Sequence, residues 1–216
     1  MVRVAVLHEA KLTPTKLDFL TAWVPTQTWV GNSDTSALEV VGSYRFDDPG
    51  GQVGIETHML RAADDSILHV PTTYRPAPLA GAETSLITTA EHSVLGTRWI
   101  YDGCVDPIYA LALATAILTG GHEADLELLT ESGSELRAPT MRVCGSGSSR
   151  SPLPIVDTVT YTSSGTTSVI SAAHVELSVL RAIGEGEATE MSLGLETLTG
   201  TLLGHDREYL LAFARR

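Results

Sequence analysis

Charged and aromatic residues gather in two neighbouring segments, residues 74–79 and 91–103, and these are the places where the sequence could carry chemistry. Five of their side chains could line a pocket for a small polar ligand, and a histidine there would titrate near neutral pH. The candidate ligand-binding residues are Arg75, His92, Arg98, Tyr101 and Asp102. A structural alternative has the two arginines paired with Glu91 and Asp102. We favour the structural alternative, because no nucleophile or metal ligand completes a catalytic set.

Motifs for several enzyme classes are missing from the sequence. No GxxxxGK[ST] loop, strand-to-helix GxGxxG turn, HExxH pair or GxSxG elbow occurs, and the seven histidines are scattered singly. A kinase site of the protein-kinase type needs an asparagine and aspartates around magnesium, but the one asparagine, Asn32, stands alone in an early loop. We therefore expect no catalytic residue, metal or cofactor, and more specifically no kinase activity.

Charge and cysteine content restrict the partners and the compartment. The 216 residues carry 14 basic and 26 acidic side chains, a formal charge of −12, which disfavours nucleic acid and anionic membrane surfaces. Cys104 and Cys144 lie 40 positions apart without the spacing of a zinc site or disulfide framework. No apolar stretch reaches the length of a membrane span. These features indicate a cytoplasmic protein with a protein partner or a homo-oligomer as its possible assembly.

The first half of the chain predicts a sheet flanked by helices. Leu17, Leu20 and Trp23 recur at helical spacing after a Thr-Pro start, which predicts a short helix ending before Pro25. β-Branched and aromatic runs separated by turn residues then predict an antiparallel meander with one buried and one solvated face, the latter including Glu56 and His58. The expected strands of the meander are 38–46, 52–61 and 66–74, and a further hairpin is expected at 84–93 and 98–101.

The second half predicts one more helix and then strands alone. Residues 108–119 follow Asp-Pro and end at Gly-Gly, and their apolar side chains cover nearly the whole circumference, as in a core helix or an interface helix. The run at 145–149 is glycine- and serine-rich, which favours a flexible loop over an anion site. The expected strands are 139–144, 155–162, 166–172, 174–182, 196–203 and 208–214. We predict an α+β fold with a β-rich C-terminal region, residues 122–216, that continues or backs the first sheet.

One family resemblance is carried by residues 70–121. The runs TYRPAPL, EHSVLGTRWIYDG and ALATAILTGG look like the N-terminal cap domain of actinobacterial maltokinases, and the earlier runs VAVLHEAKLTPTKL and GSYRFDDPGGQVGIET also fit standalone cap-like proteins. The resemblance implies a cap-like domain over residues 1–121, with a curved antiparallel sheet packed on a helix as in the cystatin arrangement. It also implies carbohydrate metabolism, including that of α-glucans, as the neighbourhood.

In those kinases the cap precedes the two lobes that bind ATP and sugar, and the catalytic residues belong to those lobes. The resemblance covers the cap alone, so no residue of this sequence corresponds to a catalytic residue of the family. The resemblance therefore implies a non-catalytic accessory, regulatory or interaction protein, which would bind through the apolar helix 107–119 or a free strand edge. The alternative is a small polar-ligand binding protein or enzyme that uses Arg75, His92, Arg98 and Asp102. Convergence of these side chains on a concave site would favour the ligand-binding alternative.

Overall fold

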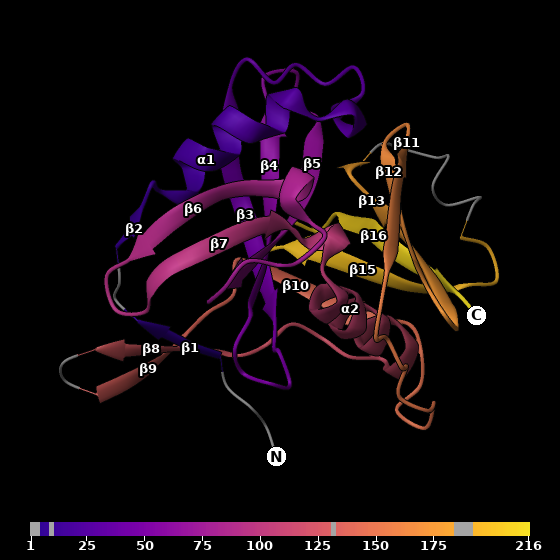
Figure 1. Ribbon diagram of the computed structural model, residues 1–216. Helices are drawn as coiled ribbons and strands as arrows, with labels where there is room; N and C mark the ends of the chain where they lie inside the picture. Colours follow the sequence, from indigo (N-terminus) through magenta and orange to yellow (C-terminus); the bar gives the residue numbers. More distant parts are fainter. Residues whose placement is uncertain (1–4, 9–10, 131–132, 184–191) are drawn as a thin grey trace.

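The computed structural model describes residues 5–8, 11–130, 133–183 and 192–216, which form three β-sheets and two α-helices (Figure 1). The largest sheet is curled and antiparallel, with strand order β2-β6-β7-β5-β4-β3 and β14 added beside β5. Its strands are β2 Leu12–Thr13, β3 Leu38–Phe46, β4 Gly54–Ala62, β5 Ile67–Arg75, β6 Leu86–His92, β7 Gly96–Asp102 and β14 Ala182–Ile183. Strands β3, β4 and β5 are consecutive antiparallel neighbours, so the expected meander is confirmed. Strands β6 and β7 form the expected hairpin, with β7 rather than β6 beside β5.

The C-terminal strands form a second antiparallel sheet with the order β10-β15-β16-β13-β12-β11. These strands are β10 Met141–Gly145, β11 Thr160–Ser164, β12 Thr167–Ala172, β13 Val175–Leu180, β15 Glu196–Leu202 and β16 Glu208–Arg215. A third, small sheet joins β1 (Ala5–His8) in parallel to β8 (Leu126–Thr130), which pairs with β9 (Gly133–Arg137). It was not expected, and Figure 1 shows it below the first sheet, away from β11–β13.

Helix α1 (Lys16–Trp23) begins at Thr15, whose hydroxyl accepts the backbone N–H of Asp18 in a capping box. Phe19 and Leu20 pack with Leu60 and Leu68 on one face of the first sheet. The short 3₁₀ segments η1 (Val24–Thr26) and η2 (Thr28–Val30) follow the helix, and η2 adds Trp29 to this cluster. Helix α1 therefore covers the face of β4 that was expected to be solvated. Glu56 and His58 on that face are both buried, so the expectation of a wet face was wrong.

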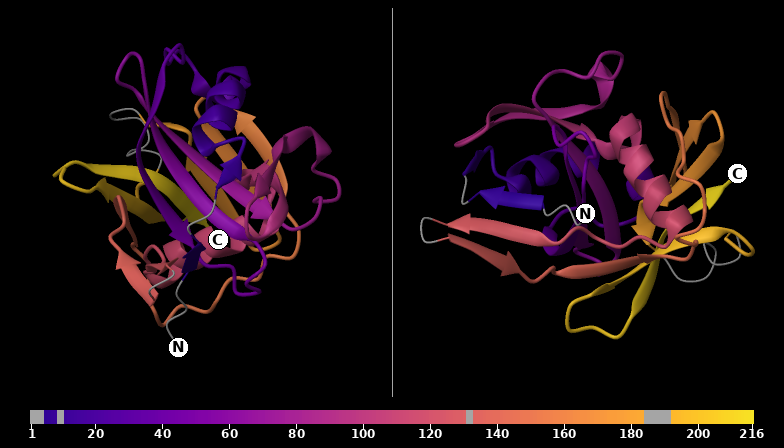
Figure 2. Two further views of the ribbon diagram at one scale, coloured as in Figure 1. Left: turned by 90° about the vertical axis from the view of Figure 1, so that its left-hand side faces the viewer. Right: turned by 90° about the horizontal axis from the view of Figure 1, so that it is seen from below.

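Helix α2 (Pro107–Thr119) lies on the opposite face, between the first and second sheets (Figures 1 and 2). Asp106 caps its first turn, and Gly120 ends it in the left-handed conformation with φ 70°. Leu113 and Ile117 are fully buried in a core that also holds Met59 of β4 and Leu211 of β16. Of the two alternatives for this helix, the structure therefore shows the core helix.

The C-terminal strands share this core with the first sheet, and β14 is hydrogen-bonded to β5. The remaining C-terminal strands are hydrogen-bonded in the separate sheets described above. A division of the chain into residues 1–121 and 122–216 as domains stays a prediction.

The glycine-rich run at 145–149 packs tightly against the end of α2. Gly147 and Ser148 donate their backbone N–H groups to the carbonyls of Ile117 and Leu118, at 2.9 and 3.1 Å. These are carbonyls of the last helical turn, which have no partner within the helix. A Cβ on Gly147 would overlap the backbone of Leu118. The glycines therefore permit a close approach between backbones, and the expectation of a flexible loop was wrong.

Candidate functional site

Two of the five predicted ligand-binding residues, His92 and Arg98, lie at the tip of the β6–β7 hairpin. Nδ1 of His92 accepts the backbone N–H groups of Val94 and Leu95, at 3.3 and 3.1 Å. The Arg98 guanidinium donates to the carbonyl of Leu95 at 2.9 Å. Both side chains thus bind the backbone of the turn that connects the two strands.

Arg75 and Tyr101 serve other parts of the fold. Nη1 of Arg75 lies 2.9 and 2.8 Å from the two carboxylate oxygens of Asp106, the residue that caps α2. The Tyr101 hydroxyl accepts the backbone N–H of Leu79 at 3.0 Å and so holds the proline-rich loop after β5. These contacts attach the first sheet to α2 and to a surface loop.

Asp102 pairs with a residue that sequence reasoning missed. Its carboxylate oxygens lie 3.0 and 3.1 Å from Nη1 of Arg181, just before β14, and the Arg181 side chain is fully buried. Asp102 also accepts the backbone N–H of Cys104 and begins the 3₁₀ segment η4 (Gly103–Val105). The expected pairing of Arg98 with Glu91 or Asp102 was therefore wrong, since Arg98 binds the turn. The available signal was an arginine directly after the apolar strand 175–180.

The five predicted residues do not converge on one concave site. Successive side chains of a strand point to opposite faces, so Arg98 and Asp102 project from one face of β7 and Tyr101 from the other. Thr73 and Tyr101 are directly paired, which puts Arg75, two residues further along β5, on the Tyr101 side. Ligand binding by these residues stays a prediction.

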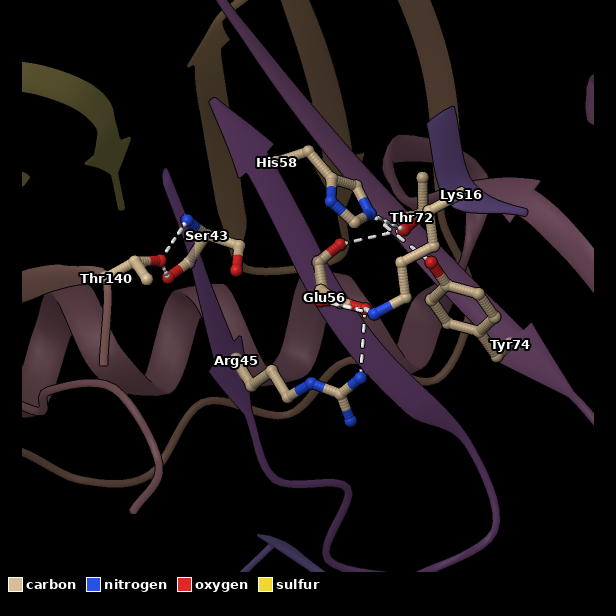
Figure 3. A network of polar contacts seen from close by, with 8 residues as sticks. All are labelled: Lys16, Ser43, Arg45, Glu56, His58, Thr72, Tyr74 and Thr140. Atoms are coloured by element: carbon tan, nitrogen blue, oxygen red, sulfur yellow. Dashed lines mark hydrogen bonds and ion pairs between the residues drawn. The ribbon is translucent and has the colours of Figure 1, made fainter. Parts of the chain in front are cut away.

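A buried polar network of the first sheet surrounds Glu56 on β4 and includes Lys16 of α1. Figure 3 shows its carboxylate between the side chains of Lys16 and Arg45. Its oxygens lie 2.7 and 2.8 Å from the Lys16 ammonium, and one lies 2.9 Å from the Arg45 guanidinium. Burial alone would raise the pKa of Glu56, but these two positive charges outweigh it and hold the pKa well below its usual range. Glu56 is thus a permanently charged anchor for α1 and β3.

His58, two residues along β4 from Glu56, completes the network (Figure 3). The Thr72 hydroxyl donates to the carbonyl of Glu56 at 2.9 Å, and it lies 3.3 Å from Nε2 of His58, as does the Tyr74 hydroxyl. Burial lowers the pKa of His58 to about 4 and raises that of Tyr74. Near neutral pH both side chains are therefore neutral. The sequence signal for this network was a glutamate and a histidine two residues apart in a strand that also contains Ile55, Met59 and Leu60.

A second buried cluster surrounds Arg181 where the two halves of the chain meet. The guanidinium lies 4.1 Å from the centre of the Trp29 ring, and its Nη1 is 3.0 Å from the Cys104 sulfur. Burial would lower the pKa of Arg181, but the Asp102 carboxylate outweighs it and raises the pKa. Burial also raises the pKa of the Cys104 thiol, so this cysteine is a neutral core residue. The cluster therefore holds one charge pair among otherwise neutral groups.

A surface hollow lies between residues 122–125 and the strands β10 and β15. Its volume is 340 Å³, and a neighbouring hollow of 230 Å³ beside α2 shares His122, Glu123 and Asp125 with it. The Glu123 carboxylate accepts the backbone N–H of Val143 at 2.9 Å and lies 3.3 Å from Arg142. The exposed Cys144 also lines the larger hollow. The residues that line the larger hollow come from four separate segments of the chain, so no local sequence pattern predicts this site.

Within the part of the chain that the structure describes, no group of three or more histidine, cysteine, aspartate or glutamate side chains is arranged to hold a metal ion. The described helices include none that is long and apolar enough to span a membrane.

Comparison with known proteins bears on the resemblance that the sequence motifs suggested. No curated protein matches the chain. A family model does, and the matched part includes β3 to β7, Glu56, His58 and the Arg75–Asp106 pair. The predicted resemblance is confirmed over this part: residues 23–106 match the family model of the maltokinase N-terminal cap domain.

Proposed function

We propose that this protein is a non-catalytic accessory or regulatory protein that acts through its cap-like domain by binding another protein. The observation that carries this proposal is that three of the four buried carboxylates of the matched segment are paired with a basic side chain, while the fourth, Asp48, accepts backbone N–H groups of its own turn. These pairs are Glu56 with Lys16 and Arg45, Asp102 with Arg181, and Asp106 with Arg75. A general acid needs a pKa near the working pH, whereas the pKa of Glu56 is shifted in the opposite direction.

The surface available for a partner is a strand edge rather than α2. Leu113 and Ile117 of α2 are fully buried within the chain, so they have no apolar face left to offer. A sheet edge offers unpaired backbone groups to an incoming strand. A role near carbohydrate or α-glucan metabolism, in the cytoplasm, fits the cap-domain match and the two free cysteines. The curled sheet with α1 against it likewise fits a cystatin-like arrangement.

The test has two measurements on the purified protein. Incubation with magnesium, ATP and maltose should give no maltose-dependent ADP release above a mock preparation. A partner recovered with the tagged chain from a native extract should then bind the purified chain by calorimetry at a fixed stoichiometry. Maltose-dependent turnover, or the failure of every recovered candidate to bind the purified chain, would overturn the proposal.

A second candidate function is the binding of a small polar ligand, and the 340 Å³ hollow favours it because ligand pockets start at about 300 Å³. Since Arg75, His92, Arg98 and Asp102 are spread over both faces of the sheet, the hollow is the better place for such a ligand. Thermal-shift screening with sugars, amino acids and phosphates tests this. Cys144→Trp should abolish any shift by filling the hollow, and a shift that survives this substitution would place the ligand elsewhere.

A further inference from the structure

Strand β11 (Thr160–Ser164) is an exposed edge of the second sheet. It pairs with β12 on one side, and no strand of the described residues pairs with its other side. Four of its five residues are exposed, and the side chain of Tyr161 turns inward, with its hydroxyl 3.5 Å from that of Ser168. The strand therefore presents a length of backbone to solvent.

The hairpin geometry determines which backbone groups point outward. Ser164 pairs with Thr167 across a two-residue turn in which Gly165 has φ 56°. In such a hairpin the pair next to the turn exchanges hydrogen bonds, and hydrogen-bonded pairs then alternate along the ladder. Ser164, Thr162 and Thr160 thus bond to β12. The N–H and C=O groups of Tyr161 and Ser163 point away from it.

The charge distribution favours a second copy of the chain on this edge. Each copy carries a formal charge of −12, which opposes self-association, yet residues 158–173 contain no aspartate, glutamate, lysine or arginine. Like charges directly opposite each other destabilise a strand pair, and in a two-fold pair a central residue faces its own copy. The edge strand β3, by contrast, carries Glu39 and Arg45. The sequence of β11 is therefore compatible with pairing to itself.

We propose that two copies of this protein associate through their β11 edges, antiparallel about a two-fold axis at Thr162. Tyr161 of one copy then faces Ser163 of the other, and each such pair exchanges two backbone hydrogen bonds. The two Thr162 residues form the non-hydrogen-bonded central pair, in which Cα atoms lie about 4.5 Å apart. The proposal does not rest on the proposed function, because it concerns the second sheet rather than the cap-like segment.

Analytical ultracentrifugation over a concentration series tests the association. The wild type should show a reversible monomer–dimer equilibrium that strengthens with added salt, because salt screens the repulsion between the acidic copies. Ser163→Pro removes an outward N–H while leaving the bonds to β12, a position where an edge strand tolerates proline. It deletes two intermolecular hydrogen bonds, and we expect the association constant to fall about 30-fold. Ser163→Ala keeps the N–H group and should associate like the wild type.

Cross-linking tests the position of the axis. In a Cys144→Ser background, Thr162→Cys should form a disulfide-linked dimer under mild oxidation, since the two Cα atoms at the axis lie within disulfide range. Ser164→Cys is the matched control and should stay unlinked, because in this register it faces Thr160 rather than its own copy. Circular dichroism confirms that each variant is folded.

Four results would overturn the proposal. A wild-type protein that is monomeric at every concentration excludes the dimer. Binding of an extended peptide of another protein along β11, in place of self-association, would show that this edge binds a different partner. Equal association of the Ser163→Pro and wild-type proteins places self-association on another surface. A Thr162→Cys protein that links no faster than the Ser164→Cys control excludes the two-fold axis.

Discussion

The ion pair between Arg181 and Asp102 makes the sharpest prediction of this structure, because it joins the cap-like segment to the C-terminal region inside the protein. Replacing Arg181 with methionine keeps much of the side-chain volume and removes the charge. The carboxylate of Asp102 would then remain buried without its counter-charge, since its side chain is 5% exposed. The contact between the guanidinium and the Trp29 ring would be lost at the same time.

We expect Arg181→Met to lower the free energy of unfolding by about 3–5 kcal/mol, the usual cost of removing one partner of a buried pair. Solvent does not screen the attraction between the two charges, because the Arg181 side chain is 0% exposed. Asp102→Asn in the same protein removes the stranded charge while keeping an oxygen to cap η4. The double variant should therefore be more stable than the sum of the two single effects predicts, by about 2–3 kcal/mol.

Urea unfolding followed by circular dichroism and by tryptophan fluorescence measures these differences. Arg215→Met is the matched control, because Arg215 pairs with Glu176 at 3.4 Å in an exposed position, with side chains 62% and 43% exposed. That substitution should cost less than about 1 kcal/mol. An Arg181→Met protein as stable as the Arg215→Met protein, or additive effects in the double variant, would refute the reasoning.

The core around α2 and the Arg181–Asp102 pair both cross the division of the chain at residue 121. A fragment of residues 1–121 lacks Arg181 and the strands that share the core of α2. We expect this fragment not to unfold cooperatively at the midpoint of the whole chain. A monomeric fragment with that midpoint would show that the first 121 residues fold independently.

Glu56→Gln should cost about 1.5–3 kcal/mol at neutral pH, because the carboxylate accepts charged hydrogen bonds from Lys16 and Arg45. Folding lowers the pKa of Glu56, so its contribution to the free energy of unfolding is fully present above the ordinary glutamate pKa of about 4.3 and is lost progressively as the pH falls below that value. The free energies of unfolding of the wild type and of Glu56→Gln should therefore converge in acid. A difference that stays constant with pH would contradict this. Burial lowers the pKa of His58 to about 4 and that of His69 to about 3. The chemical shifts of their ring protons should therefore stay constant down to about pH 5, and a titration midpoint near pH 6.5 for either histidine would contradict the buried neutral state. Gly147→Ala should lower the melting temperature far more than Gly165→Ala, because an added Cβ meets the backbone of Leu118 at position 147 and open space at position 165. Equal changes in melting temperature would argue against the close packing of Gly147 on α2.

The elements of this fold were largely readable from the sequence because they depend on neighbouring residues. The strands 38–46 and 66–74 differ from β3 and β5 by at most one residue at each end, since β-branched runs and turn residues act locally. Helix α2 likewise begins and ends where its aspartate cap and Gly120 predicted. The match of residues 23–106 to the cap-domain model was also foreseen from contiguous motifs.

The burial of polar strand residues was not readable in the same way. An alternating strand indicates which side chains share a face, and it correctly grouped Glu56 with His58. Whether that face is wet depends on what packs over it, and α1 brings Lys16 from 40 residues away to neutralise Glu56. The same alternation is therefore compatible with a solvated face and with a buried ion pair.

The sequence by itself thus determined strands β3 to β7, both helices, the caps of α2 and the family resemblance, because each of these rests on residues close together in the chain. Only the tertiary structure decided that Asp102 pairs with Arg181 rather than Arg98, that β1 joins β8, and that Gly147 packs on α2. Each of these contacts joins segments at least 29 residues apart, as Gly147 and Leu118 are. The geometry of the folded chain selects among many chemically equivalent partners at such separations, and a single sequence does not distinguish them.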